Sequence, residues 1–291
     1  MTPELHHLRG LSLSGFHRLA YWEWAPATGV EPRGRAVVCL HGLTRQGRDF
    51  DVLAQALVRR GRRVVCPDLV GRGRSGWLAD PDGYTLLQYG ADMNALLARL
   101  DVDEVDWVGT SLGGLVGMIL AGQPGSPIRR LVINDIGPFI PGAALRRIGA
   151  YLNAAPRRFA DAAEAVAYFR ETLAPYGALT DAQWAHLAGH SVCEDEAAGN
   201  GGGYRLRRDP AIGRAYRPWL LGSVAAWEHW DKVACPTLLL RGALSDLLPL
   251  PTALEMTRRG PRPGLVEFPD VGHVPALMTA EQLGPVLEFL A

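Results

Sequence analysis

The chain has 291 residues, of which 48% are hydrophobic and 21% charged, and its 30 basic and 30 acidic residues give a formal net charge of zero. This balance argues against a nucleic acid or an acidic membrane as partner, and no apolar run is long enough to cross a bilayer. The first 15 residues lack the apolar core of a signal peptide. Because the four cysteines show no C-x-x-C spacing, we expect a reduced, cytoplasmic protein.

The first half of the chain alternates strand-like and helix-like stretches. Residues 6–24 alternate loosely and predict a hairpin of two edge strands. Continuous apolar or β-branched runs predict buried strands, and apolar residues at helical spacing predict amphipathic helices. The predicted strands then cover 37–40, 64–66, 104–108 and 131–133, and the predicted helices cover 50–60 and 85–100. This alternation predicts a mostly parallel central sheet with helices on both faces.

The pattern changes after Gly137, and no run typical of a buried strand appears before Asp231. Four helices are expected there: over 143–153, after the capping pairs Asp161 with Glu164 and Thr180 with Gln183, and from Asp209-Pro210 toward Trp219. The stretch Asn200 to Gly203 predicts a flexible loop tip.

After this region the α/β pattern resumes, with strands over 237–240 and 265–268 and helices over 250–259 and 280–290. The sequence therefore predicts one α/β core in two parts, residues 1–136 and 232–291. An all-helical cap, residues 137–231, is inserted between these two parts.

The stretch from Gly109 to Gly114 predicts a catalytic serine. It follows an apolar run and opens another, which is typical of a strand, a very tight turn and a helix. A serine at position 111 would adopt an unfavourable backbone conformation, and Gly109 and Gly113 leave room for it. Gly114 lets the helix begin close to the strand.

A serine needs a base to take its proton and a carboxylate to orient that base. His273 is the predicted base, because it follows the strand over 265–268 through a short loop containing Gly272. Asp246 is the favoured acid, from the usual order Ser, Asp, His. Asp135 is the competing acid, since it comes directly after the strand over 131–133, but we expect it to cap a turn.

Two backbone N–H groups must also stabilise an oxyanion. One is expected from Leu112, directly after Ser111. The other is expected from Leu43, in the loop after the first buried strand.

With these residues in place, the chain resembles the α/β-hydrolases of the cap-bearing esterase and lipase-like superfamily. The matching motifs occur in family order over nearly the whole chain: His41-Gly42, the loop from Asp68 to Ser75, Gly109 to Gly113, Ser245-Asp246 and Gly272-His273. The resemblance implies hydrolysis through an acyl-enzyme, without a cofactor or metal. Related dehalogenases and epoxide hydrolases carry an aspartate at the position of Ser111, so both are disfavoured.

The sequence therefore predicts a serine hydrolase that cleaves a small to medium, fairly apolar carboxylic ester. The alternatives are a lactonase and a carbon–carbon bond hydrolase of ring-cleavage keto-acids. The latter needs a cleft arginine, for which Arg146, Arg147 and the cluster Arg205, Arg207 and Arg208 are available. A fold member that only binds a ligand is disfavoured by the intact triad residues.

Two further patterns are set aside. Gly71 to Gly76 matches G-x-G-x-x-G, but no helix is expected to open there, so a dinucleotide site is rejected. His186 and His190 lie four residues apart on a predicted helix, but without the glutamate of H-E-x-x-H they do not predict a metal site.

Overall fold

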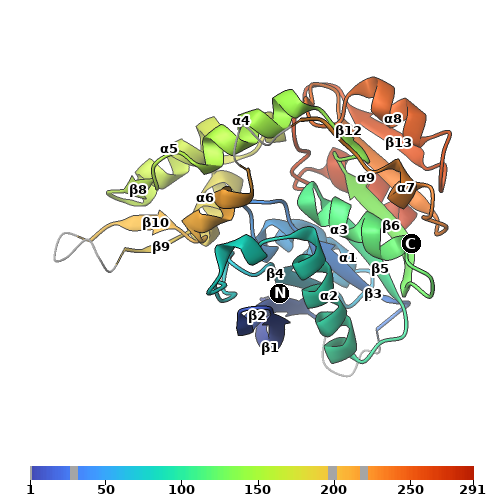
Figure 1. Cartoon of the computed structure of the whole chain (residues 1–291), viewed down its shortest axis with the longest axis horizontal. Helices are drawn as coiled ribbons and strands as arrows, with labels where there is room; N and C mark the ends of the chain where they lie inside the picture. Colours follow the sequence, from blue (N-terminus) through green and yellow to red (C-terminus); the bar gives the residue numbers. More distant parts are fainter. Residues whose placement is uncertain (1, 27–31, 196–201, 217–221) are drawn as a thin grey trace.

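The computed structural model describes residues 2–26, 32–195, 202–216 and 222–291. Its centre is an eight-stranded sheet in the order β1-β2-β4-β3-β5-β6-β12-β13 (Figure 1). The strands are β1 (Glu4–Ser12), β2 (Gly15–Trp24), β3 (Ala36–Leu40), β4 (Val64–Asp68), β5 (Val105–Thr110), β6 (Ile128–Asn134), β12 (Thr237–Gly242) and β13 (Gly264–Phe268). From β4 to β13 every neighbouring pair is parallel, which confirms the predicted mostly parallel sheet.

The N-terminal hairpin forms as predicted, but only one of its strands lies at the sheet edge. β1 pairs antiparallel with β2, and β2 pairs antiparallel with β4, for example Tyr21 opposite Pro67. Leu19, Ala20 and Tyr21 are buried in β2. The expectation of two edge strands is therefore wrong for β2, because its second edge is covered by β4.

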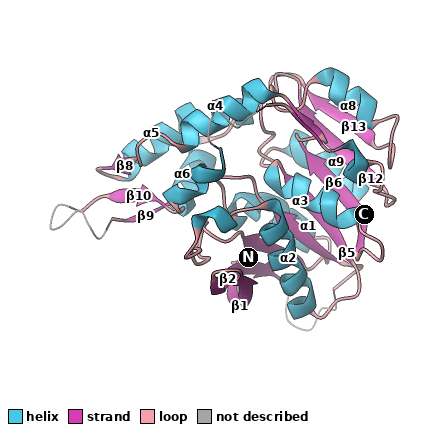
Figure 2. Ribbon diagram, viewed as in Figure 1, coloured by secondary structure: helices cyan, strands magenta, loops and turns pink. Residues whose placement is uncertain are grey.

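Helices cover both faces of the sheet (Figure 2). Alternate residues of β3 supply the two cores: Val38 and Leu40 belong to one apolar cluster, and Val37 and Cys39 to the other, as the two-residue period of a strand requires. The first cluster contains side chains of α2 (Leu86–Leu100), α3 (Leu112–Ala121) and α8 (Leu250–Met256), and the second those of α1 (Asp51–Val58) and α9 (Ala280–Phe289).

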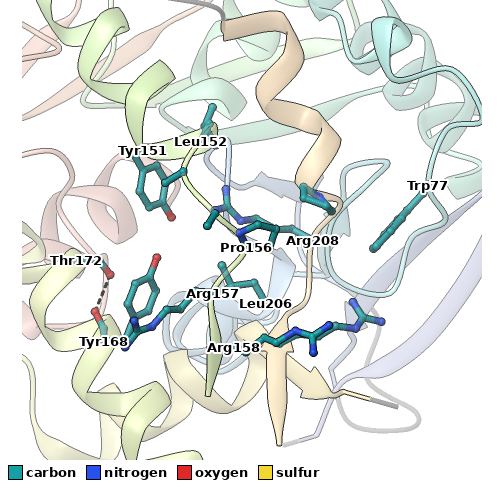
Figure 3. A pocket seen from close by; sticks show the side chains of 14 residues that line it. Trp77, Tyr151, Leu152, Pro156, Arg157, Arg158, Tyr168, Thr172, Leu206 and Arg208 are labelled. Atoms are coloured by element: carbon teal, nitrogen blue, oxygen red, sulfur yellow. Dashed lines mark hydrogen bonds between the residues drawn. The ribbon is translucent and has the colours of Figure 1, made fainter. Parts of the chain in front are cut away.

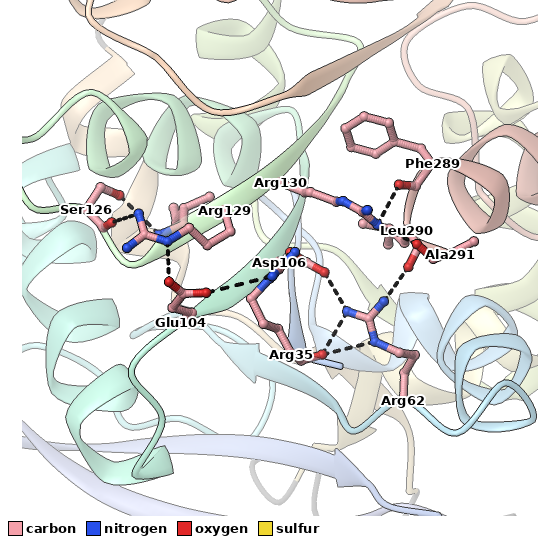
Figure 4. A network of polar contacts seen from close by, with 11 residues as sticks. Arg35, Arg62, Glu104, Asp106, Ser126, Arg129, Arg130, Phe289, Leu290 and Ala291 are labelled. Carbon is pink, nitrogen blue, oxygen red and sulfur yellow. Dashed lines mark hydrogen bonds and ion pairs between the residues drawn. The ribbon is translucent and has the colours of Figure 1, made fainter. Parts of the chain in front are cut away.

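A buried ion-pair network fixes the amino-terminal ends of the central strands (Figure 4). Asp106 of β5 is 1% exposed and accepts hydrogen bonds from Arg35 at 2.8 Å and from Arg62 at 2.5 Å. Arg62 also donates to the carbonyl of Leu290 at the end of the chain. The network thus holds the C-terminal helix to the strand whose opposite end leads to Ser111.

The region between β6 and β12 is mostly helical, but it is not all-helical as predicted. It contains the α-helices α4 (Gly142–Leu152), α5 (Ala162–Thr172), α6 (Asp181–Ser191) and α7 (Trp227–Trp230), with 3-10 helices at Ala174–Tyr176 and Pro210–Tyr216. The short strands β8 (Arg158–Phe159), β10 (Tyr204–Leu206) and β9 (Val192–Glu194) form a three-stranded sheet, and β11 (Val224–Ala225) pairs with β7 (Phe139–Ile140).

These strands have two or three residues each, which is too short to show an alternating pattern in the sequence. Their partners are also distant, since Tyr204 lies opposite both Phe159 and Glu194. In Figure 1, α4 and α5 lead away from the sheet, and β9 and β10 form the outermost part of this region. Trp219 and the loop residues Asn200 and Gly201 lie outside the described residues.

The carboxyl ends of the parallel strands meet at one edge of the sheet, where open α/β sheets bind their ligands. The loop after β3, the turn after β5, the end of β6 and the loop after β13 all lie there. Within the described part of the chain, no helix has the length and apolar character needed to cross a membrane.

Candidate active site

Ser111 occupies a strained turn between β5 and α3, as the sequence predicts. Its backbone has φ 51° and ψ −114°, a region that L-residues rarely adopt. A Cβ on Gly109 would lie 2.3 Å from the Gly113 carbonyl oxygen, and one on Gly113 would lie 1.9 Å from the Leu40 carbonyl oxygen. Both glycines are therefore required by close backbone approach, and the turn projects the serine above the strand ends.

His273 lies beside Ser111, which confirms that the two predicted residues come together. Its Nε2 is 2.9 Å from Ser111 Oγ. Its Nδ1 is 2.7 Å from Oδ2 of Asp135. Because an ionised carboxylate only accepts hydrogen bonds, Nδ1 carries the proton and Nε2 is left to accept the Ser111 hydroxyl. This is the arrangement in which an imidazole can act as a general base toward serine.

Asp135, and not Asp246, is the acid that contacts His273. Asp135 is fully buried, and its second oxygen, Oδ1, accepts the backbone N–H of Gly242 at 2.9 Å. Its own N–H donates to the Leu240 carbonyl at 2.9 Å. These bonds to β12 hold the carboxylate in place, and the prediction that Asp135 merely caps a turn is wrong.

Asp246 pairs with an arginine and not with the histidine. It comes four residues after the end of β12, in a turn where Ser245 Oγ accepts the N–H groups of Leu247 and Leu248. Its side chain is 50% exposed and forms a bidentate ion pair with Arg147 of α4, with both distances 2.8 Å. The prediction that Asp246 orients His273 is therefore contradicted by the structure.

One signal in the sequence favours Asp135. It follows Asn134, the last residue of the predicted strand's extension β6, without an intervening loop. In the structure, the backbone of Asp135 adopts a positive φ of 57°. Aspartate tolerates this left-handed conformation better than most residues. Asn134 supports the same constellation, since its carbonyl accepts the N–H of Ser111 at 2.9 Å and its Nδ2 donates to the Pro275 carbonyl at 2.8 Å.

The two predicted oxyanion donors are backbone N–H groups near Ser111 that have no hydrogen-bond acceptor among the described residues. Leu112 N is the first N–H of α3, and neither it nor Leu43 N donates to any residue of the described ranges. The Gly42–Leu43 peptide is fixed by His41, whose Nδ1–H donates to the Gly42 carbonyl at 2.7 Å. In a trans peptide the N–H opposes the carbonyl, so this bond turns the Leu43 N–H away from His41.

Two buried side chains support this loop, and the sequence did not single out either role. Burial, reinforced by the nearby charges of Arg72 and Arg45, lowers the pKa of His41 to about 3, which keeps the imidazole neutral. Its Nε2 accepts the N–H of Leu69 at 3.0 Å. Arg72, 1% exposed, donates to the Leu43 carbonyl at 2.9 Å.

A cavity of about 240 Å³ contains Ser111 and His273. The loop after β3 forms one wall, and α4, α5 and the 3-10 helix Ala174–Tyr176 form the other. Two tyrosines from the region between β6 and β12, Tyr151 and Tyr176, line it. We refer to this space as the triad cavity.

The glycine-rich loop after β4 has a structural role. Turns, a bend and the isolated bridge of Arg72 cover residues 70–75. No helix opens there, whereas a dinucleotide site of this motif needs one. The Asp68 carboxylate is buried and accepts the N–H groups of Gly47 at 2.7 Å and Arg74 at 2.8 Å. Burial raises the pKa of Asp68 to about 6.

His186 and His190 do approach a third residue of a type that binds metals, which is Asp51. Arg48 already binds both oxygens of Asp51, at 2.8 Å and 2.5 Å. Burial, followed by the charge of Arg48, lowers the pKa of His190 to about 4. A cation placed here would face the guanidinium of Arg48, so the arrangement does not favour a metal.

The fold, the serine turn and the contacts of His273 with Ser111 and Asp135 together define an α/β-hydrolase. The family model described as alpha/beta hydrolase fold matches residues 35–277, and the chain belongs to this family. It is 44% identical, over 99% of its length and 98% of the relative's, to a 3-hydroxybutyrate-oligomer hydrolase of Cupriavidus necator.

Solved structures agree with this assignment. An alpha/beta hydrolase of Novosphingobium aromaticivorans has a TM-score of 0.83 and 32% identity, with 99% of each chain covered. A protein of Rickettsia typhi has a TM-score of 0.88 and 29% identity, with 100% of this chain and 99% of that chain covered.

Proposed function

We propose that the protein is a serine ester hydrolase that cleaves short oligoesters of 3-hydroxybutyrate through an acyl-enzyme. The observation that carries the chemistry is the continuous chain of hydrogen bonds from Ser111 Oγ through His273 to the buried Asp135. The substrate class rests on the full-length similarity to the Cupriavidus necator enzyme, and the small triad cavity is compatible with a short acyl unit.

In the proposed reaction, His273 Nε2 takes the hydroxyl proton as Ser111 Oγ attacks the ester carbonyl. The negative charge that develops on the carbonyl oxygen is stabilised by the N–H groups of Leu43 and Leu112; loss of one such donor slows catalysis by roughly 10²–10³-fold in other hydrolases. The imidazolium, paired with Asp135, then donates its proton to the alcohol oxygen as the ester C–O bond breaks. Water, deprotonated by His273, releases the acid from Ser111.

We also infer that residues 137–231 act as a cap on the core formed by 1–136 and 232–291. β6 and β12 pair side by side, with Leu131 opposite Thr237, although this whole region separates them in sequence. Its residues Ile148, Tyr151 and Leu173 line the triad cavity. A cap in this position would set the size and polarity of the acyl pocket.

The test compares wild-type enzyme with Ser111→Ala on the 3-hydroxybutyrate dimer and trimer, with monomer release measured by chromatography. A ladder of p-nitrophenyl esters from acetyl to decanoyl is run in parallel. We expect the wild type to cleave both oligomers and the shorter p-nitrophenyl esters, and Ser111→Ala to cleave none. Cleavage of long-chain esters alone would refute the substrate class, and full turnover by Ser111→Ala would refute the mechanism.

A further inference from the structure

A second cavity adjoins the triad cavity, and the two share part of their walls. Its volume is about 370 Å³, and Tyr151 of α4 and Thr172 of α5 line both spaces. The triad cavity, at about 240 Å³, is smaller than the ~300–1,000 Å³ typical of small-molecule sites. A ligand that extends from Ser111 past Tyr151 would occupy a combined space within that range.

Four arginines line the second cavity, and Figure 3 labels three of them, Arg157, Arg158 and Arg208. Two form ion pairs with carboxylates, at 3.0 and 3.1 Å: Arg157 with Glu164 and Arg158 with Asp195. Among the described residues, no carboxylate lies within ion-pair distance of Arg205 or Arg208. Instead, the Arg208 guanidinium lies 5.0 Å from the centre of the Tyr151 ring, and that of Arg205 lies 5.8 Å from the Trp77 ring.

The core of the protein holds Arg208 in this position. Its backbone forms a β-bridge with Arg72 in the loop after β4, and Gly73 N donates to the carbonyl of Arg207 at 3.1 Å. Arg207 donates through Nη2 to the Val192 carbonyl at 2.8 Å. Neighbouring arginines therefore have different roles: Arg207 fixes the backbone, and Arg208 lines the cavity.

The remaining lining of the second cavity is mainly apolar. Its other members include Leu152, Ala154, Ala155, Pro156, Leu206 and Pro210. An apolar space with two guanidiniums that have no acidic partner among the described residues suits a ligand with a short hydrocarbon body and an anionic end. Arginine is the side chain best matched to a carboxylate, which it can bind with two parallel hydrogen bonds.

We propose that the second cavity binds the terminal carboxylate of the oligoester while an ester carbonyl lies at Ser111, with Arg208 and Arg205 as the carboxylate-binding residues. This inference rests on the proposed function, because it assumes an oligomer of a hydroxy acid as substrate. Such an oligomer ends in a free carboxylate on the alcohol side of its last ester bond. The second cavity is thus assigned to the alcohol product, and the triad cavity to the acyl group.

The chemical step follows this assignment. The Ser111 Oγ–carbonyl bond forms and the ester C–O bond breaks, and the departing oxygen receives its proton from His273. The hydroxy-acid product carries its carboxylate in the second cavity and leaves before water attacks the acyl-enzyme. Because hydrogen bonds to charged groups contribute about 1.5–3 kcal/mol, Arg208 and Arg205 are each expected to favour the carboxylate by about 10- to 100-fold in kcat/KM.

The test compares two substrates that differ only at the terminal carboxylate: the 3-hydroxybutyrate trimer as the free acid and the same trimer as its methyl ester. The readout is the ratio of their kcat/KM values, in which any fraction of misfolded enzyme cancels. It is measured for the wild type, Arg208→Met and Arg205→Gln. Arg170→Gln is the matched control, because Arg170 is paired with Asp181 at 2.5 Å and lines neither cavity.

We expect the wild type to prefer the free acid, mainly through a lower KM. The preference should fall about 10- to 100-fold in Arg208→Met and in the same direction in Arg205→Gln, and it should remain in Arg170→Gln. A wild type that cleaves both trimers equally, or variants that keep the full preference, would overturn the inference while the proposed function stands. A wild type that cleaves p-nitrophenyl butyrate but neither trimer would overturn the proposed substrate class and the inference with it.

Discussion

Replacing Asp135 by asparagine tests whether Asp135 or Asp246 is the acid that orients His273. In the native site both oxygens of Asp135 accept hydrogen bonds, one from His273 at 2.7 Å and the other from Gly242 N at 2.9 Å. Asparagine has only one acceptor oxygen, so it cannot replace both bonds.

Each orientation of the amide has a specific consequence. If the oxygen keeps the Gly242 bond, the NH₂ group faces His273 Nδ1 and favours the tautomer that carries its proton on Nε2, which cannot accept the Ser111 proton. If the oxygen faces His273, the NH₂ group opposes the Gly242 N–H in a fully buried place, which costs about 1–3 kcal/mol. The first orientation is therefore preferred, and kcat is expected to fall by about 10⁴-fold, the loss seen when a serine-protease aspartate is replaced in this way.

Asp246→Asn is the matched control, because it makes the same chemical change at the other candidate. Its ion pair with Arg147 is half exposed, and such pairs contribute about 0–1 kcal/mol. We expect kcat on p-nitrophenyl butyrate to stay within about fivefold of the wild type, which corresponds to this energy range. Loss of activity in Asp246→Asn with turnover retained in Asp135→Asn would refute the assignment of the acid to Asp135.

Three further predictions concern the supports of the site. Gly113→Ala, whose Cβ would lie 1.9 Å from the Leu40 carbonyl oxygen, should lower the free energy of unfolding by at least about 3 kcal/mol. Gly189→Ala, in open space within α6, should raise it by about 0.5–1 kcal/mol. Urea unfolding measures both changes, and equal effects would contradict the packing argument. Burial lowers the pKa of His41 from its ordinary value of 6.5 to about 3 in the folded chain. The unfolded chain therefore binds more protons between these two pH values, and stability falls as pH falls through that window, by up to about 1.4 kcal/mol per pH unit. His41→Gln should flatten this acid slope, and an unchanged slope in urea titrations from pH 7 to 4 would contradict it. Burial raises the pKa of Asp68 from 3.8 to about 6, so the folded chain binds more protons than the unfolded chain and stability rises as pH falls through that window. Asp68→Asn should remove this gain, so that the variant loses stability more steeply than the wild type as pH falls. A shallower loss of stability in the variant would refute the predicted direction of the effect.

The sequence predicts most of the core because its signals are local. The strands β3, β4 and β12 each contain a continuous apolar run. Thr180 caps its helix as expected, with a side chain that accepts the N–H group of Gln183. The turn at Ser111 is similarly local, since all the glycines that it needs lie within three residues.

The identity of the acid depends on tertiary geometry that local patterns do not contain. Asp135 and Asp246 both follow parallel strands, and spacing along the chain does not show which carboxylate is buried. The choice is made by β6 lying between β5 and β12, which places Asp135 between the serine turn and Gly242. The arginines of the second cavity are set by the non-local bridge between Arg72 and Arg208, so the sequence shows the cluster without its location.

Labelling with a fluorophosphonate tests the central claim most directly, because this reagent reacts preferentially with a serine that is activated as a nucleophile. Wild-type enzyme, Ser111→Ala and His273→Ala are treated side by side, and the modified peptide is identified by mass spectrometry. We predict one adduct, on Ser111, in the wild type and none in either variant. An adduct on another residue, or full labelling of Ser111 without His273, would contradict the proposed nucleophile and its base.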